Sequence, residues 1–197
     1  MTAALPDPIR IALLVADALD ACSISYAVGG SVASSISGEP RSTLDVDMVV
    51  SMSDADVDPL IRSLGGEFHA DPDALRRAVR ARSSANLVHL ATSMKVDLFV
   101  EGGSALDTAL LDRRQRVRVS ADPERHLYVH APEDILLQKL RWYRLSGDAS
   151  DRQWRDALGI LIVQAGRLDE TYLGRAADTL GVTDLLHKAQ REASGIR

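Results

Sequence analysis

Residues 44–52 are the most informative segment of the chain, because two aspartates, Asp45 and Asp47, lie one residue apart in a stretch that predicts a β-strand. A strand points residues i and i+2 to the same face, so both carboxylates project together while Val46 and Met48 point to the other side. Burying carboxylates without a partner destabilises a fold by several kcal/mol per ion. The pair therefore predicts a strand whose acidic face binds a cation.

A third aspartate, Asp97, lies in a second strand-like segment, residues 95–100. There it shares a face with Lys95 and Phe99, while the intervening apolar residues form the buried side. Mg²⁺ prefers hard oxygen ligands and commonly takes one or two carboxylates together with phosphates and water. Two ions about 3.5–4 Å apart, bridged by shared carboxylates, support in-line nucleotidyl displacement. We therefore expect Asp45, Asp47 and Asp97 to hold two Mg²⁺ ions.

A Gly-Gly-Ser turn, made of Gly29, Gly30 and Ser31, precedes the aspartate pair. Glycine suits a tight strand-to-helix turn and permits close approach to the backbone, and Ser31 is a favourable N-cap for a short helix. Free N–H groups at a helix start bind phosphate. Alone, such a turn is more often only a capped turn, just as an Asp-x-Asp pair often faces solvent on an edge strand. The order of the two motifs favours a phosphate site beside the acids.

The rest of the chain predicts an α/β (α+β) fold in two parts, residues 1–130 and 131–197. In the first part strands alternate with amphipathic helices, which predicts a mixed, mostly antiparallel sheet flanked by helices. In the second part apolar residues recur at helical spacing, which predicts a helical bundle packed on the cleft. The predicted helices are residues 8–21, 32–36, 54–64, 73–80, 132–145, 152–165, 170–180 and 183–193, and the predicted strands are residues 24–28, 44–52, 87–91, 95–100, 115–119 and 127–130.

Composition excludes several classes of protein. Of the 197 residues, 46% are apolar and 26% charged, as in ordinary globular domains. No run approaches the roughly 18 apolar residues of a membrane span, so we expect a cytoplasmic protein without membrane contact. A single cysteine excludes an internal disulfide, and five scattered histidines argue against zinc. The net charge of −5 gives no overall basic surface for nucleic acid. A local stripe of arginines could still serve one, at positions 76, 77, 80 and 82 or at positions 113, 114, 116 and 118.

The order of these motifs resembles the nucleotidyltransferase superfamily that includes polymerase beta and the aminoglycoside nucleotidyltransferases. The resemblance rests on the Gly-Gly-Ser turn at residues 29–31, on Asp45 and Asp47 in one strand, and on Asp97 in a later strand. In the second part, the stretches APEDILLQKLRWYR and SDRQWRDALGIL look like the C-terminal helices of the bacterial AbiEii-type nucleotidyltransferase toxins and their uncharacterised relatives. The resemblance to these toxins covers most of the chain.

The resemblance implies Mg²⁺-dependent transfer of a nucleoside monophosphate from a nucleoside triphosphate to an acceptor. It implies that Asp45 and Asp47 hold both metal ions and that Asp97 holds the ion that activates the acceptor. The resemblance leaves three classes of acceptor open: RNA, a protein or a small molecule. In some members of the family the acceptor is the 3′ end of tRNA. For a toxin, the implied partner is a cognate antitoxin. The residues expected to bind the nucleotide are Gly29, Gly30, Ser31, Lys139 and Arg41.

Three charged side chains each have more than one interpretation. Lys139 falls on the apolar stripe of its predicted helix, so it either extends along that surface to solvent or, as the resemblance implies, reaches the triphosphate. Arg41, beside the Asp-x-Asp strand, either binds phosphate or faces water. Asp156 is expected to pair with Arg152 or Arg155 on its own helix.

Two other classes of function stay open. The chain could keep the scaffold as a catalytically silent binding or regulatory module, which the intact set of three acids disfavours. It could instead modify an antibiotic, which is the same chemistry with a different acceptor pocket. An enzyme should bind nucleotide in a metal-dependent manner, whereas a silent module need not. An antibiotic-modifying enzyme differs from the other nucleotidyltransferases only in the identity of its acceptor.

Overall fold

The computed structural model describes residues 7–102 and 110–196, which form two compact units. The first unit takes in the described residues up to Val32 and those from Ser42 to His130. The second unit takes in residues 33–41 and the described residues from Ala131 onward. Residues 33–41 therefore group with the helical part of the chain, whereas the sequence pattern places them in the first part.

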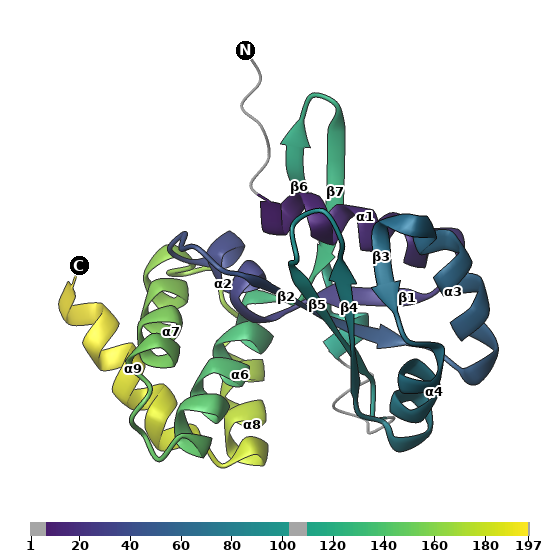
Figure 1. The fold of residues 1–197 in the computed structure, drawn as a ribbon. Helices are drawn as coiled ribbons and strands as arrows, with labels where there is room; N and C mark the ends of the chain where they lie inside the picture. The colour runs from purple at the N-terminus through teal and green to yellow at the C-terminus, as the bar shows by residue number, and fades with distance from the viewer. Residues whose placement is uncertain (1–6, 103–109, 197) are drawn as a thin grey trace. The chain divides into compact units, whose positions relative to one another are not determined.

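Seven strands of the described first unit form one mixed sheet in the order β3-β4-β5-β2-β1-β7-β6 (Figure 1). Strand β2 runs parallel to β5 and β1 runs parallel to β7, while the remaining neighbours in this part of the chain are antiparallel. The predicted mixed, mostly antiparallel sheet is confirmed. The strands are β1 (Ser25–Val28), β2 (Asp45–Ser51), β3 (Phe68–Ala70), β4 (Ser84–His89), β5 (Lys95–Val100), β6 (Gln115–Ala121) and β7 (Glu124–Val129).

The helices of the first unit cover the apolar side of this sheet. Helix α1 packs against β1, β2 and β7, helix α4 packs against β4 and β5, and α3 contacts both helices (Figure 1). On the covered side Val46, Met48 and Leu98 are completely buried. Alternation along each strand then leaves the residues between them on the opposite face. These helices are α1 (Asp7–Ala21), α3 (Val57–Leu64) and α4 (Pro72–Ala81). Two 3₁₀ turns flank α3, η1 (Asp54–Asp56) before it and η2 (Gly65–Glu67) after it.

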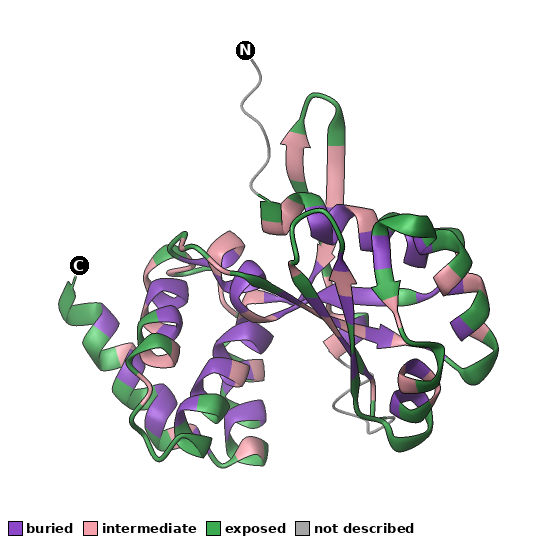
Figure 2. Cartoon of the chain, in the orientation of Figure 1, coloured by how far each residue is buried: buried purple, intermediate pink, exposed green. Residues whose placement is uncertain are grey.

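The second unit is a helical bundle around α6, which packs against α7, α8 and α9 and is buried along most of its length (Figure 2). Its helices begin and end at residues that favour helix ends: Pro132 opens α6, Asp169 caps α8 by accepting from the Tyr172 N–H, and Gly181 ends α8 in the left-handed conformation. Among the described residues, no helix has the length and apolar character to cross a membrane. The bundle consists of α6 (Pro132–Leu145), α7 (Asp151–Val163), α8 (Glu170–Leu180) and α9 (Thr183–Ile196).

Candidate active site

The three predicted acids lie together on the face of the sheet opposite its buried side. Strands β2 and β5 are parallel neighbours, and their register places Asp47 directly beside Asp97. Residues paired in this way point to the same side of a sheet. Asp45 lies two residues before Asp47 on the same face and is close enough to Asp97 to raise its pKa. The structure therefore brings together carboxylates that are about 50 residues apart in the chain.

The Gly-Gly-Ser turn lies against the same acids. The Gly29 N–H donates to the Asp47 carbonyl oxygen at 2.8 Å, which fixes the end of β1 beside β2. Gly30 has φ of +56°, and a Cβ added there would overlap Asp47 Oδ2. Glycine is therefore required both by the backbone conformation and by the carboxylate. The sequence predicts Ser31 as the N-cap of the helix that follows the turn. Helix α2 (Gly30–Ser37) instead begins at Gly30, so the buried Ser31 lies inside its first turn.

Neutral polar side chains bind two of the acids. Thr43 donates through Oγ1 to Asp45 Oδ1 at 2.5 Å. Asn86, the register partner of Asp97 on β4, donates through Nδ2 to Asp97 Oδ1. Asn86 cannot be recognised from the sequence, because the predicted strand begins at residue 87 and only the pairing of β4 with β5 reveals the position of Asn86. Lys95, the register partner of Asp45, adds a positive charge beside the acids.

The pKa of Asp97 reflects both its burial and a neighbouring carboxylate. Burial raises the pKa of Asp97 above its ordinary value, and the negative charge of Asp45 raises it further. Lys95 and the hydrogen bond from Asn86 lower the pKa again but do not cancel the rise. A divalent cation between the carboxylates would remove the repulsion that remains.

The acids fit a metal that is shared with a substrate, and not a closed structural metal site. Within residues 7–102 and 110–196, no three side chains of His, Cys, Asp or Glu are placed so that they could hold a metal ion. Mg²⁺ needs no such group, since it keeps several waters and binds through one or two carboxylates and the phosphates of its substrate. Asp45, Asp47 and Asp97 supply hard oxygen donors on one face of the sheet. The negative charges of Asp45 and Asp97 repel each other there. This donor set suits Mg²⁺ bound together with a nucleotide.

In the second unit, Lys139 and Arg41 share one buried carboxylate. Asp156 Oδ2 lies 2.8 Å from Lys139 Nζ, and Asp156 Oδ1 lies 2.9 Å from Arg41 Nε. The hydroxyl of Ser34 adds a hydrogen bond to Oδ2 at 3.3 Å. Burial pushes the pKa of Asp156 up, but the hydrogen bonds and charges of Arg41 and Lys139 outweigh it and leave the pKa below its ordinary value. The described ion pairs therefore bring one guanidinium and one ammonium group to the same carboxylate.

This cluster corrects three interpretations of the sequence. Asp156 pairs with Arg41 and Lys139 and not with Arg152 or Arg155, because α7 directs it into the interior of the unit. Lys139 does not extend to solvent, since only 6% of its side chain is exposed. Arg41 does not simply face water, because its guanidinium donates to the Asp156 carboxylate through Nε and through a terminal nitrogen. The partners are separated by as many as 115 positions, so helical spacing could not reveal them. Phosphate binding by Lys139 and Arg41 stays a prediction.

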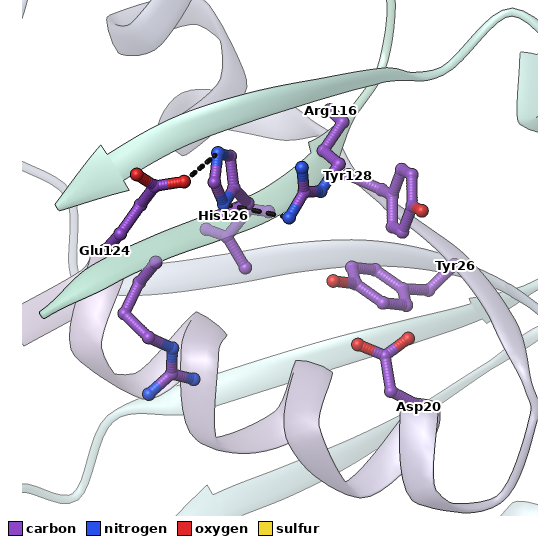
Figure 3. A pocket seen from close by; sticks show the side chains of 8 residues that line it. Asp20, Tyr26, Arg116, Glu124, His126 and Tyr128 are labelled. Atoms are coloured by element: carbon purple, nitrogen blue, oxygen red, sulfur yellow. Dashed lines mark hydrogen bonds and ion pairs between the residues drawn. The ribbon is translucent and has the colours of Figure 1, made fainter. Parts of the chain in front are cut away.

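A separate pocket of about 430 Å³ opens in the first unit beside the β6–β7 hairpin (Figure 3). Its polar side chains bind one another: Arg116 lies 3.1 Å from His126 Nδ1, and His126 Nε2 lies 3.5 Å from Glu124. Arg125 pairs with Asp17 at 2.7 Å. None of the predicted acids or turn residues is among the described side chains that line it. The acidic face of β2 and β5 is therefore the better candidate for an active site.

Comparison with known proteins identifies the fold. No protein-family model matches the chain, and no match is found among curated proteins. Among solved structures, an antigenic nucleotidyltransferase-like protein from Paracoccidioides brasiliensis matches with a TM-score of 0.57 and 19% identity, covering 95% of this chain and 94% of that one. The antibiotic-resistance factor ANT(2'')-Ia matches with a TM-score of 0.52 and 12% identity, covering 96% and 97%. The chain therefore has the fold of nucleotidyltransferase-like proteins.

Proposed function

We propose that this protein transfers a nucleoside monophosphate from a nucleoside triphosphate to an acceptor in a Mg²⁺-dependent reaction. The observation that carries the proposal is the meeting of Asp45, Asp47 and Asp97 on one face of the sheet, with Gly30 against the Asp47 carboxylate. The nucleotidyltransferase-like fold supports it. A catalytically silent module would have no use for Asp45 and Asp97 on one face of the sheet, where the negative charge of Asp45 raises the pKa of Asp97.

Each residue of the first unit has a chemical role in this proposal. Asp45 and Asp47 would hold the metal ions, and Asp97 would hold the ion nearer the acceptor. Bound Mg²⁺ would neutralise the charge that develops on the transferred and leaving phosphates. Backbone N–H groups at the start of α2 and the Ser31 hydroxyl would bind phosphate oxygens.

The reaction would be an in-line displacement at the α-phosphorus. An acceptor hydroxyl oxygen would form the new bond to phosphorus, while the bond to the bridging oxygen breaks and pyrophosphate leaves. Asp97 would accept the hydroxyl proton.

The Lys139, Arg41 and Asp156 cluster of the second unit supports a further part of the proposal. Arg41 and Lys139 bring a guanidinium and an ammonium group to the same carboxylate, and both kinds of group bind phosphate in proteins. We propose that Lys139 and Arg41 bind the nucleotide. Lys139→Met should then raise the KM for the nucleotide about ten-fold, as expected for the loss of one charge-assisted hydrogen bond.

The test is transfer of label from each α-³²P-labelled nucleoside triphosphate in the presence of Mg²⁺ and cell extract. The double variant Asp45→Ala, Asp47→Ala should lose transfer completely and keep its circular dichroism spectrum, and chelation of Mg²⁺ should have the same effect on the unmodified protein. Asp73→Ala, at an exposed carboxylate on α4, is the matched control and should keep full activity. Transfer that survives loss of Asp45 and Asp47 would refute the proposed function.

The same assay identifies the acceptor. Label on RNA, on protein or on small molecules distinguishes the three acceptor classes directly. A role as a toxin requires, in addition, that expression of the active protein and not of the Asp45→Ala, Asp47→Ala variant arrests growth, and that a partner protein relieves the arrest. Label on an aminoglycoside with no growth arrest would support antibiotic modification instead.

A further inference from the structure

Asn86 contacts the acid site from a strand that carries none of the acids. Its Nδ2 donates to Asp97 Oδ1, and the antiparallel register of β4 and β5 places the two residues side by side. Asn86 is exposed, so its amide adds little to the core. Asparagine is also disfavoured within strands, where β-branched and aromatic residues pack better. Stability alone therefore gives a weak reason for asparagine at this position.

The position of Asn86 completes a row of polar groups across the sheet. Asn86 on β4 lies beside Asp97 on β5, Asp97 lies beside Asp47 on β2, and the Gly29 N–H donates to the Asp47 backbone. A carboxylate has two oxygen atoms, and Asn86 occupies Oδ1 of Asp97. The hydrogen bond thereby restricts rotation of the carboxylate and leaves Oδ2 for a cation or for the acceptor proton.

We propose that Asn86 is a positioning residue that orients the Asp97 carboxylate for catalysis. The inference rests on the proposed function, because it gives Asn86 a role only where Asp97 takes part in transfer. The described hydrogen bond of the Asn86 side chain is to Asp97, so loss of Asn86 should affect the chemical step and metal binding more than nucleotide binding. A packing residue would not produce this division.

The test compares Asn86→Leu, which keeps the approximate size and loses the donor, with Ser84→Ala. Ser84 lies two residues earlier on the same face of β4 and pairs with Phe99, so it is a matched control. Asn86→Leu should lower kcat about ten-fold, as expected for one hydrogen bond to a charged group, with the nucleotide KM changed less than about two-fold. Asn86→Ala should behave in the same way and serves if the leucine variant does not fold.

A second readout requires no turnover. Titration of Mn²⁺, with free Mn²⁺ followed by electron paramagnetic resonance, should show about five-fold weaker binding in Asn86→Leu than in the Ser84→Ala control. In an Asp97→Asn background, Asn86→Leu should cause no further weakening, because the residue through which it acts has been changed.

The outcomes separate this inference from the proposed function. Asn86→Leu that matches Ser84→Ala in kcat and in Mn²⁺ binding, while Asp45→Ala, Asp47→Ala abolishes transfer, would overturn the role of Asn86 and leave the proposed function standing. An equal effect of Asn86→Leu with and without Asp97 would also overturn it. Full transfer by the Asp45→Ala, Asp47→Ala variant would instead remove the proposed function itself.

Discussion

The carboxylate of Asp47 occupies the space that a side chain at position 30 would need, and Gly30 adopts a positive φ of +56° beside it. The glycine of the turn and the aspartate of the strand are therefore one structural feature, although 16 residues separate them in the chain. The hydrogen bond from Gly29 to the Asp47 backbone fixes the same junction. This junction holds the start of α2, a potential phosphate site, next to the acids.

Gly30→Ala should therefore abolish activity, because the added methyl displaces the Asp47 carboxylate. Gly181→Ala provides the matched control, since Gly181 has a similar φ of +66° in the left-handed region and no described neighbour within 4 Å of an added Cβ. Both variants should lose about 1 kcal/mol of stability from the positive φ, measured by urea unfolding. Only Gly30→Ala should also lower kcat by more than about 100-fold, because displacement of a catalytic group by about 1 Å can cost that much. Equal activity in the two variants would contradict the account.

Asp97→Asn should stabilise the metal-free protein while it removes activity. A carboxyl group whose folded pKa is raised contributes stability only at low pH, and this contribution is lost as the pH rises through the folded pKa. At neutral pH the neutral amide should therefore raise the melting midpoint in EDTA by about 2 °C, the scale of a partly exposed charge effect. Mg²⁺ with a nucleoside triphosphate should stabilise the unmodified protein more than the variant. A lower midpoint for Asp97→Asn in EDTA would be evidence against repulsion among the acids.

Asp156→Ala should destabilise the helical unit strongly. The variant leaves Lys139 and Arg41 without the carboxylate that both contact, and breaking a buried ion pair from one side costs about 3–5 kcal/mol. Since Arg41 is partly exposed, we expect about 3 kcal/mol in urea unfolding. Asp151→Ala, at an exposed residue at the start of the same helix, should cost less than about 1 kcal/mol. A loss of less than about 1 kcal/mol for Asp156→Ala would show that the cluster does not stabilise the helical unit.

His130 should make the protein sensitive to acid. The imidazole is buried, and burial lowers its pKa to about 4, against about 6.5 in an unfolded chain. Between these pH values the unfolded chain binds a proton that the folded protein does not, so the free energy of unfolding falls as the pH drops from about 6.5 to about 4. The fall attributable to His130 is about 3 kcal/mol over the full window.

The check is urea unfolding at pH 7 and pH 4.5 for the unmodified protein and for His130→Asn. The variant should lose less stability on acidification, whereas His69→Asn, at an exposed position on β3, should behave like the unmodified protein. An equal loss in all three proteins would show that other groups cause the acid sensitivity.

The secondary structure is largely predictable from the sequence, because it depends on local patterns. Alternation identifies β2 and β5, and helical spacing with clear start and stop signals identifies the four helices of the second unit. Strand β3 is missed because three residues are too few to show alternation. The placement of residues 33–41 is missed because it depends on contacts with α7 and with the residue that follows it, Gln164, which donates a hydrogen bond to the Ser37 carbonyl oxygen at 2.7 Å.

The candidate site is predictable only where its residues share a motif. Asp45 and Asp47 follow from spacing along one strand, and Asp97 follows from its place in another strand. The partners of the acids depend on strand register, which decides that Asn86 and not a neighbouring residue meets Asp97. The interior position of Asp156 depends on packing between helices and on a loop far away in the chain. No local pattern carries that information.

The most direct test of the central claim is a crystal structure with Mn²⁺ and a non-hydrolysable nucleoside triphosphate, with anomalous diffraction locating the metal. The account predicts Mn²⁺ within about 2.3 Å of carboxylate oxygens of Asp45 and Asp47, in contact with the phosphates beside the start of α2. Bound nucleotide with its metal away from these two carboxylates would contradict it.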